Sequence, residues 1–490
     1  MAKLYVFGIG GTGSRVLRSF TYLLASGVKL QGFSEVVPII IDADKTAGDK
    51  TELVDLLRDY SKLYKMVDHS NAAFNEGFFQ TMMSSCCLDY TMRIPGETSQ
   101  PFRDYMKFGE LSPENKALIQ ALFSDENLLA EMKVGFKGNP NIGSVVLNQF
   151  VDTEDFKSFA NKFSQGDAIF IISSIFGGTG ASGFPLLLKN LRSNNGKEKY
   201  DNSAIISKAQ IGAITVLPYF NLKSPTDGKT GQLDGSTFIQ KTRAALQYYH
   251  DNLKELNHLY YIADDLRPSY TNCDGGAKQK NKPHFIEFVS ALAIFDFAKH
   301  ASSSNAANNV SIQTEYHEYG IKENRETLNF GDMYDSYMYI KPMTKFLLMH
   351  NFMMQALGNS WGKSWAKAHE PIFNETSLSQ DDFWKTLNTY IKGYRQWLLD
   401  MAENKRSFAP FNLNTDGNHV FDLVSGITPV KHGFLSLNKN YDRYNKTLDE
   451  IKEERRKQMA STLQQSCPSH WMDLFARVTE KLLNEESNIR

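Results

Sequence analysis

Two glycine-rich segments carry the residues best suited to bind phosphate groups. Residues 8–13 (GIGGTG) satisfy the pattern G-x-G-x-x-G, and residues 176–183 (FGGTGASG) form a second cluster. Glycines let a backbone turn sharply and approach phosphate oxygens, and the N-terminus of a following helix adds free N–H groups and a positive dipole end. Thr179 and Ser182 add two hydroxyl donors.

Each cluster lies between a predicted strand and a predicted helix. Residues 4–7 and 168–173 are short apolar runs, and the residues after each glycine cluster have helical spacing of apolar side chains. Pro185 suits the first turn of the second helix. A third run, residues 36–41, is almost continuously apolar, as expected of a strand covered on both faces. The predicted fold class is therefore α/β, a parallel sheet with helices on both faces.

The two loops together favour a nucleoside triphosphate over a dinucleotide. A dinucleotide needs one pyrophosphate loop, whereas loops from two neighbouring strands can surround three phosphates. Asp42 ends the strand at 36–41 and could bind a ribose hydroxyl, which leaves an NAD-dependent oxidoreductase as an alternative. The chain has no G-x-x-x-x-G-K-[ST] loop, so ordinary P-loop chemistry is not expected.

The chain length of 490 residues predicts two or three domains. We place a nucleotide-binding domain at 1–301, with a helical insertion at about 45–165, and an α+β domain with a helical tail at 302–490. Further strands are expected at 211–217 and 259–262, and a buried helix at 285–299. Residues 316–319 and 327–330 suggest a hairpin.

The composition gives no general drive toward nucleic acid or membranes. Lys and Arg total 54 against 55 Asp and Glu, a net charge of −1. No apolar run approaches the ~20 residues that span a bilayer, and the first residues enter a strand without a leader, so we expect a cytoplasmic protein. Four cysteines show no metal-ligand spacing, and no protein-held metal site is predicted.

The motifs resemble those of the tubulin/FtsZ superfamily, in the manner of divergent bacterial tubulin-like proteins. Residues 4–13 match the family's first phosphate loop, and residues 177–182 match its G-G-G-T-G-[ST]-G signature. Residues 216–220 look like the strand and Pro-aromatic loop near the ribose, and residues 259–262 like the strand before the long central helix. The resemblance covers roughly residues 1–335. It implies a parallel-sheet GTPase domain with a long central helix and a smaller C-terminal domain.

The resemblance also implies ligands and roles for particular residues. The implied cofactors are GTP or GDP, with Mg²⁺ beside the triphosphate. Asp42 and Asp44 are expected near the γ-phosphate region, through Mg²⁺ or water. The implied nucleotide-binding set is Gly8, Gly10, Gly11, Thr12, Gly13, Arg15, Asp42, Asp44, Gly177, Gly178, Thr179, Gly180, Ala181, Ser182, Pro218, Tyr219 and Asn281.

Three departures from the family pattern affect this expectation. Phe176 replaces the first glycine of the signature and Ser182 the last, while Arg15 stands where FtsZ has an Asn near the base. The family's acidic catalytic loop acts on the next subunit, and its usual N-x-D pattern is absent here. Asp332 stands in the corresponding place, as a catalytic candidate or as an ordinary turn and helix cap.

Two main functions follow. The first is a GTP-binding protein that assembles head to tail into filaments and hydrolyses GTP between subunits, since a heterologous contact need not close. The second is a nucleotide-gated binding module with little or no hydrolysis, which recruits another protein through the 45–165 insertion or the C-terminal tail.

Overall fold

The fold is taken from a computed structural model of the chain. It describes residues 2–69, 77–94, 96, 98–132, 135–136, 139–193, 200–222, 235–253, 255–265, 269–270, 276–277, 280–304, 313–318, 321, 325–368, 371–431, 440–458, 466–487 and 489.

A parallel sheet of seven strands in the order β3-β2-β1-β4-β5-β7-β9 forms the centre of the molecule. Its strands are β1 (Lys3–Ile9), β2 (Glu35–Ile41), β3 (Met82–Met83), β4 (Ala168–Ser174), β5 (Gln210–Val216), β7 (His258–Ile262) and β9 (Glu315–Glu318). The central strands are apolar and buried along nearly their whole length, as a sheet covered on both faces requires. The predicted α/β fold class is confirmed.

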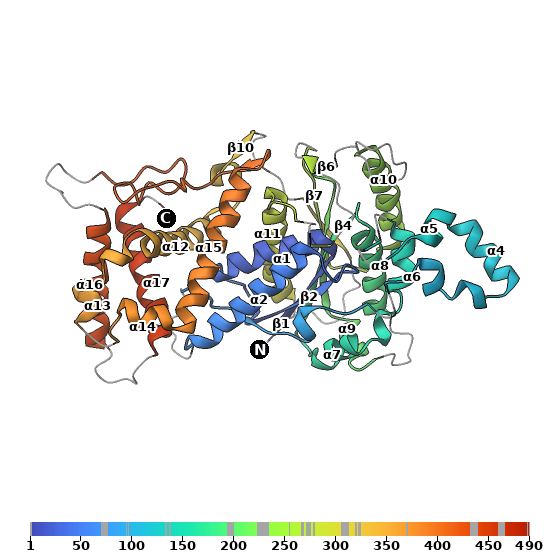
Figure 1. Cartoon of the computed structure of the whole chain (residues 1–490), viewed down its shortest axis with the longest axis horizontal. Coiled ribbons are helices and arrows are strands. Elements are labelled where there is room, and N and C mark those ends of the chain that lie inside the picture. Colours follow the sequence, from blue (N-terminus) through green and yellow to red (C-terminus); the bar gives the residue numbers. More distant parts are fainter. Residues whose placement is uncertain are drawn as a thin grey trace.

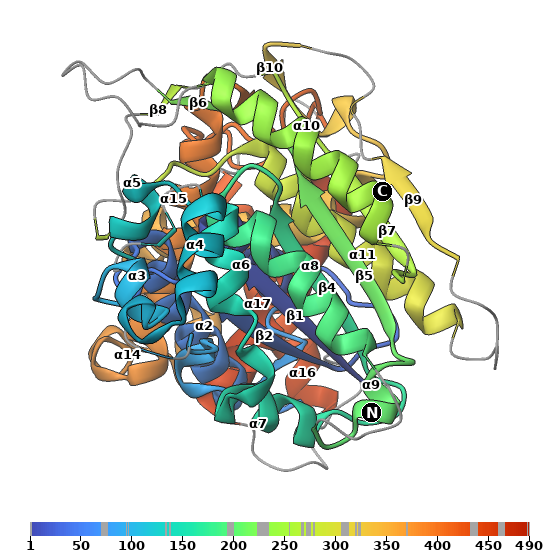
Figure 2. The ribbon, with the colours of Figure 1, turned by 90° about the vertical axis from the view of Figure 1, so that its right-hand side faces the viewer.

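Helices cover both faces of this sheet. On one face lie α1 (Gly10–Ala25), α2 (Gly48–Met66) and α11 (Phe285–Ser304), and on the other lie α6 (Pro140–Leu147), α8 (Gly178–Arg192) and α10 (Gly235–Asn252) (Figures 1 and 2). Helix α1 is almost wholly buried, because it is packed between the sheet, α2 and α11.

The segment at 45–165 contributes to the layers as well as projecting from them. Helix α2 packs on α1, and β3 extends the sheet beside β2. By contrast, α3 (Phe102–Tyr105), α4 (Pro113–Leu122) and α5 (Asp125–Leu129) project at one end of the molecule (Figure 1). Helix α4 buries none of its residues. The segment then returns to the sheet through α6 and α7 (Glu154–Lys162).

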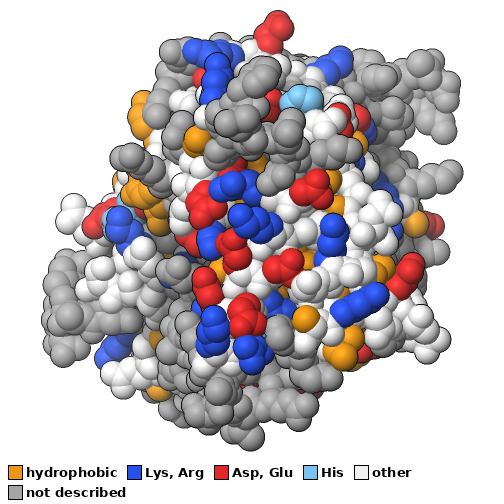
Figure 3. All heavy atoms as spheres, turned by 90° about the vertical axis from the view of Figure 1, so that its left-hand side faces the viewer, with side chains coloured by type: hydrophobic (Ala, Val, Ile, Leu, Met, Phe, Trp, Pro, Cys, Tyr) orange, Lys and Arg blue, Asp and Glu red, His pale blue; other side chains and the backbone are white. Residues whose placement is uncertain are grey.

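The C-terminal part is a group of helices packed on the α1–α2 side of the sheet (Figure 1). These are α12 (Tyr337–Gln355), α13 (Ser364–Lys367), α14 (Glu375–Gln380), α15 (Asp382–Ala402), α16 (Asn440–Gln458) and α17 (Cys467–Glu486). Acidic and basic side chains are intermingled on their outer face (Figure 3), with pairs such as Arg456–Glu453 and Lys481–Glu450. This described face therefore carries no single-sign patch.

The predicted hairpin is wrong. Strand β9 pairs with β7 in parallel, while β10 (Thr327–Leu328) pairs with β11 (Ser407–Phe408) far along the chain. Strand β9 pairs at the edge of the parallel sheet, as its last strand. Strand β10 instead pairs in the C-terminal part, where Leu328 is buried beside Phe408. Both segments have strand-like sequences, but a local pattern does not specify the partner.

Two short strands, β6 (Asn221–Leu222) and β8 (Ser269–Tyr270), pair outside the main sheet, and α9 (Ser203–Ile206) precedes β5. Within the described ranges, every helix is too short or too polar to cross a bilayer.

Candidate functional site

The two glycine loops meet where the order of the strands reverses. Strand β1 pairs with β4 in parallel register, with Gly8 opposite Ile172. From this pair the chain runs on through α1 to β2 in one direction and through α8 to β5 in the other. In open α/β sheets, the crevice beyond the carboxyl ends of strands at such a switch point is where ligands bind.

The two loops lie close together, about one methyl group apart at Gly10. Gly10 has φ of +70°, a conformation that favours glycine, and a Cβ built on it would lie 3.5 Å from Cβ of Thr179 and 3.8 Å from N of Gly180. A Cβ on Gly13 would lie 2.5 Å from the carbonyl carbon of Gly8. Glycine at 13 therefore lets α1 begin directly against β1, and glycine at 10 leaves a gap between the loops that one methyl group would fill.

Both helices that follow these loops begin without a side-chain cap. Ile9 precedes α1 and Gly177 precedes α8, and neither helix has an acidic residue in its first turn. Two positive dipole ends thus lie at the carboxyl ends of the neighbouring strands β1 and β4, an arrangement that suits an anion. Ser182 does not add a free donor, because its hydroxyl donates to the carbonyl of Gly178 at 2.7 Å.

Arg15 lies at the centre of a buried polar cluster next to the first loop. Its Nε donates to Oε1 of Glu287 at 2.5 Å and its Nη1 to Oδ2 of Asp49 at 2.7 Å. Its Nη2 donates to the hydroxyls of Tyr219 at 2.9 Å and Thr12 at 3.3 Å. Arg15 therefore joins α1, α2, α11 and the loop after β5, and four of its five N–H groups are already used.

The electrostatics of this cluster keep Arg15 and Glu287 charged. Burial opposes the charged forms, but the neighbouring Tyr219, Glu287 and Asp49 raise the pKa of Arg15 well above its ordinary value. Burial also works against Glu287, yet Arg15 brings the pKa of Glu287 below normal. For Asp49 the effect of burial exceeds that of Arg15, and its pKa is raised. Two carboxylates thus face one guanidinium in a nearly water-free space.

Asp42 and Asp44 organise the loop after β2. Oδ1 of Asp42 accepts from the backbone N–H of Asp44 at 3.0 Å, and Asp44 accepts from Thr46 and from the N–H of Gly276. Burial raises the pKa of Asp42 to about 6, although the Asp44 N–H and Lys50 act in the opposite direction. The Asp44 side chain thus connects the loop after β2 to the segment around Gly276.

Most of the remaining sequence-predicted residues lie near α11 and the end of β5, and Ala181 lies in α8. Tyr219 is buried with its hydroxyl donating to Glu287 at 2.6 Å, and the half-buried Pro218 precedes it. The backbone N–H of Asn281 donates to Asp49 at 3.4 Å, which places this residue beside the Arg15 cluster. Phe176 packs edge-on against Tyr219 and Phe220, on the β5 side of the second loop. The half-buried Ala181 lies in the first turn of α8, where its carbonyl accepts from Tyr249.

Asp332 lies in a turn of the C-terminal part. Its Oδ2 accepts from the N–H of Asn329 at 2.9 Å, in a reciprocal capping arrangement, and its Oδ1 lies 3.4 Å from Nε of Arg325. Among the contacts of the described residues, none joins Asp332 to either glycine loop. This is the turn-and-cap geometry that the sequence left as the alternative to catalysis.

Sequence reasoning missed two members of the cluster, Asp49 and Glu287. Each is an acidic residue in the first turn of a helix, a position where a negative charge usually stabilises the helix by interacting with its dipole. Glu287 also accepts from the N–H of His284, which caps α11 through its Nδ1. No local pattern links these acids to Arg15, which is 272 residues from Glu287.

The fold and the paired loops define an open parallel α/β protein with two glycine loops at its switch point. No protein-family model matches the chain, and a search of curated proteins finds no match.

Among solved structures, the chain is similar to CetZ2 from Haloferax volcanii in a GTPγS-bound protofilament, at 13% identity and a TM-score of 0.31, over 62% of this chain and 59% of that one. It is similar to CetZ from Methanosaeta thermophila at 16% identity and a TM-score of 0.25, over 64% and 57%. An empty FtsZ dimer from M. jannaschii gives 14% identity and a TM-score of 0.28, over 64% and 57%. The chain thus spans less than two thirds of the length of each.

Proposed function

We propose that this chain is a GTP-binding protein of the tubulin/FtsZ type that associates head to tail and hydrolyses GTP between subunits. The observation that carries the proposal is the close approach of the two glycine loops at the uncapped N-termini of α1 and α8. Backbone N–H groups of both loops would hold the phosphates, and Mg²⁺ would offset their charge.

In this proposal the loop residues bind the polyphosphate and Arg15 positions them. The proposed phosphate-binding set is Gly8, Gly10, Gly11, Thr12 and Gly13 with Gly177, Gly178, Thr179, Gly180, Ala181 and Ser182. Arg15 has little hydrogen-bonding capacity left for a base, because Glu287, Asp49, Tyr219 and Thr12 accept hydrogen bonds from its N–H groups. Its role is to hold the first loop relative to the Pro218–Tyr219 loop and Asn281.

A second candidate, nucleotide binding with little hydrolysis, is favoured by the contacts of Asp332. Both carboxylate oxygens of this catalytic candidate already have partners, Asn329 in its own turn and Arg325 before β10. In that case nucleotide would gate recruitment of another protein, through the projecting helices α3–α5 or the C-terminal helices.

The test is nucleotide binding by thermal shift and calorimetry, with GTP, ATP and NAD compared in the presence of Mg²⁺. A ligand that binds only the folded state raises the midpoint, and we expect this for GTP. NAD raising it instead would support the oxidoreductase alternative, and no binding at millimolar GTP would remove the proposal.

The variant Gly10→Ala locates the site. Its added methyl group would enter the space between the loops at ordinary contact distance from Thr179, and the φ of +70° adds backbone strain, so we expect GTP affinity to fall at least tenfold together with some loss of stability. Gly426→Ala is the matched control, because Gly426 also has a positive φ, +82°, and a Cβ there meets nothing within 4 Å. Light scattering and phosphate release with GTP then separate the filament-forming GTPase from the non-hydrolysing module.

A further inference from the structure

A cluster of two histidines and one glutamate lies at the far edge of the sheet, away from the glycine loops. His258 is the first residue of β7, and Glu315 and His317 lie on β9, the last strand of the sheet. In the parallel register, His258 is opposite Glu315 and Tyr260 is opposite His317. Since alternate residues of a strand share a face, these side chains all project from one face of the sheet.

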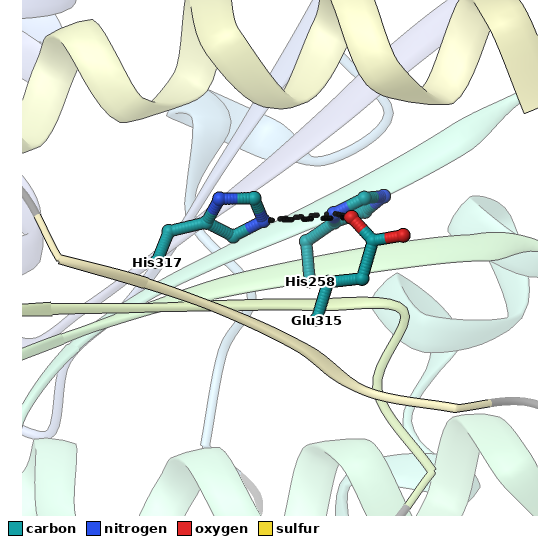
Figure 4. Close-up of side chains that lie close together, drawn as sticks. All are labelled: His258, Glu315 and His317. Carbon is teal, nitrogen blue, oxygen red and sulfur yellow. Dashed lines mark hydrogen bonds and ion pairs between the residues drawn. The ribbon is translucent and has the colours of Figure 1, made fainter.

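The ligand atoms of the three side chains converge on one point (Figure 4). Nδ1 of His258 lies 3.1 Å from Nε2 of His317 and 3.4 Å from Oε2 of Glu315, and the remaining separation, His317 to Glu315, is 4.0 Å. An ion held at about 2.0–2.2 Å from three tetrahedral ligands separates them by roughly 3.3–3.6 Å. The observed separations bracket that range, so an ion fits with small side-chain movements.

We propose that His258, Glu315 and His317 bind a first-row divalent transition metal ion, with Zn²⁺ as the best fit. Two imidazole nitrogens and a carboxylate oxygen are ligands that suit Zn²⁺, whereas Mg²⁺ and Ca²⁺ prefer all-oxygen sites. This inference is independent of the nucleotide proposal, because β9 is separated from the loop-bearing strand β4 by β5 and β7.

The surroundings of the three residues support a built site. The ring of Tyr260 stacks on that of His317 with 4.4 Å between centroids, and the Tyr260 hydroxyl donates to Asp296 on α11 at 2.7 Å. This fixes the orientation of the His317 ring, as outer partners of metal ligands commonly do.

An ion can reach the cluster from solvent. His258 is only 6% exposed, but His317 is 22% and Glu315 65% exposed. His317 also lines a cavity of about 600 Å³ beside the carboxyl end of β7. The fourth position would be taken by water or by His300 of α11, whose ring centroid lies 5.2 Å from that of His258 and 5.6 Å from that of His317.

Metal binding would change one tautomer and join two strands. Without metal, one of the two facing ring nitrogens carries the proton of their hydrogen bond and the other accepts it. With metal, both facing nitrogens must be unprotonated. The histidine that carried the shared proton on its facing nitrogen therefore carries a proton on its other ring nitrogen instead. The ion would then connect the edge strand β9 to β7 through side chains as well as backbone.

The experiment uses the untagged full-length chain freed of metal by a chelator. We expect one equivalent of Zn²⁺ by calorimetry, a higher midpoint of thermal unfolding with Zn²⁺ than with Mg²⁺, and the visible absorption of tetrahedral Co²⁺ when Co²⁺ replaces Zn²⁺. Failure of the wild-type chain to bind Zn²⁺ would overturn the proposal.

Variants assign the ligands. His317→Gln and Glu315→Gln should each weaken Zn²⁺ binding at least tenfold, and the exposed Glu315 can be changed without disturbing the core. His419→Gln is the matched control, since this exposed histidine lies elsewhere and pairs with Asp416. Unchanged affinity in both ligand variants would contradict the site and indicate scattered surface binding. His300→Gln identifies the fourth ligand. If His300 binds the ion, this variant changes the Co²⁺ absorption spectrum, and if water is the fourth ligand, the spectrum stays as in the wild-type chain.

Discussion

At the scale of single residues, the Arg15 cluster places one cation and two acidic side chains in the buried core. One guanidinium serves Asp49 and Glu287, and all three side chains are at most 4% exposed. A buried ion pair gives little net stability compared with an apolar replacement, but removal of one partner leaves the others charged and unsolvated. The cluster therefore stabilises one relative placement of α1, α2 and α11.

We predict that Arg15→Ala lowers the free energy of unfolding by about 3–5 kcal/mol, because two buried carboxylates lose their cation. Urea denaturation followed by circular dichroism measures this. The control is Arg58→Ala, which removes ion pairs to Asp55 and Asp89 that are about half exposed and should cost at most ~1 kcal/mol. Equal effects of the two substitutions would show that the Arg15 cluster is not energetically special.

At the scale of elements, the contact between β1 and α1 decides whether the first loop exists. The chain turns within a few residues because Gly8 and Gly13 let strand and helix backbones touch. A larger residue in either place would push α1 away from the sheet and out of line with α8. The geometry of the switch point thus depends on close packing of backbone against backbone.

For Gly13→Ala we expect a loss of about 1–3 kcal/mol, since the new methyl group would lie 2.5 Å and 2.8 Å from backbone atoms of Gly8 that cannot rotate away. Guanidinium chloride titration gives the value. Gly109→Ala, whose methyl group meets open space, should stay within about 0.5 kcal/mol of wild type. If Gly13→Ala left the free energy of unfolding unchanged, the backbone of α1 at Gly13 would not lie against Gly8 as described.

At the scale of the whole molecule, the two parts that we propose, 1–301 and 302–490, share one core. Tyr22 of α1 packs against Tyr390, Tyr394 and Trp397 of α15, with ring centroids 5.2–5.7 Å apart. The Tyr390 hydroxyl also donates to the carbonyl of Thr21 at 3.4 Å. Such an interface is apolar and aromatic, so we expect the two parts to unfold together.

Tyr22→Ala tests this coupling, because all five tryptophans lie beyond residue 360 and report on the C-terminal part. The substitution should cost about 3–5 kcal/mol and shift the tryptophan fluorescence transition and the far-ultraviolet circular dichroism transition together. Tyr248→Ala, at a tyrosine that is 51% exposed, should shift neither. A fluorescence transition unmoved by Tyr22→Ala would show that the parts unfold independently.

The sequence by itself determined the central strands of the sheet and the two glycine-rich turns, because both depend on residues that are close together in the chain. Apolar runs predicted β1, β2, β4, β5 and β7, and the glycine clusters predicted the turns into α1 and α8. These features follow from local sterics and from burial on both faces, which a short segment expresses without help.

Only the tertiary structure decided which distant groups meet. It gave β9 a parallel partner in β7, brought Glu287 and Asp49 to Arg15, and set His258 beside the Glu-x-His pair of β9. Because side chains alternate along a strand, Glu315 and His317 share one face of β9. The third proposed ligand, His258, lies on β7, 57 residues earlier in the chain (315 − 258). Charges and metal ligands act across space, and their partners are fixed by the sheet register and helix packing of the whole chain.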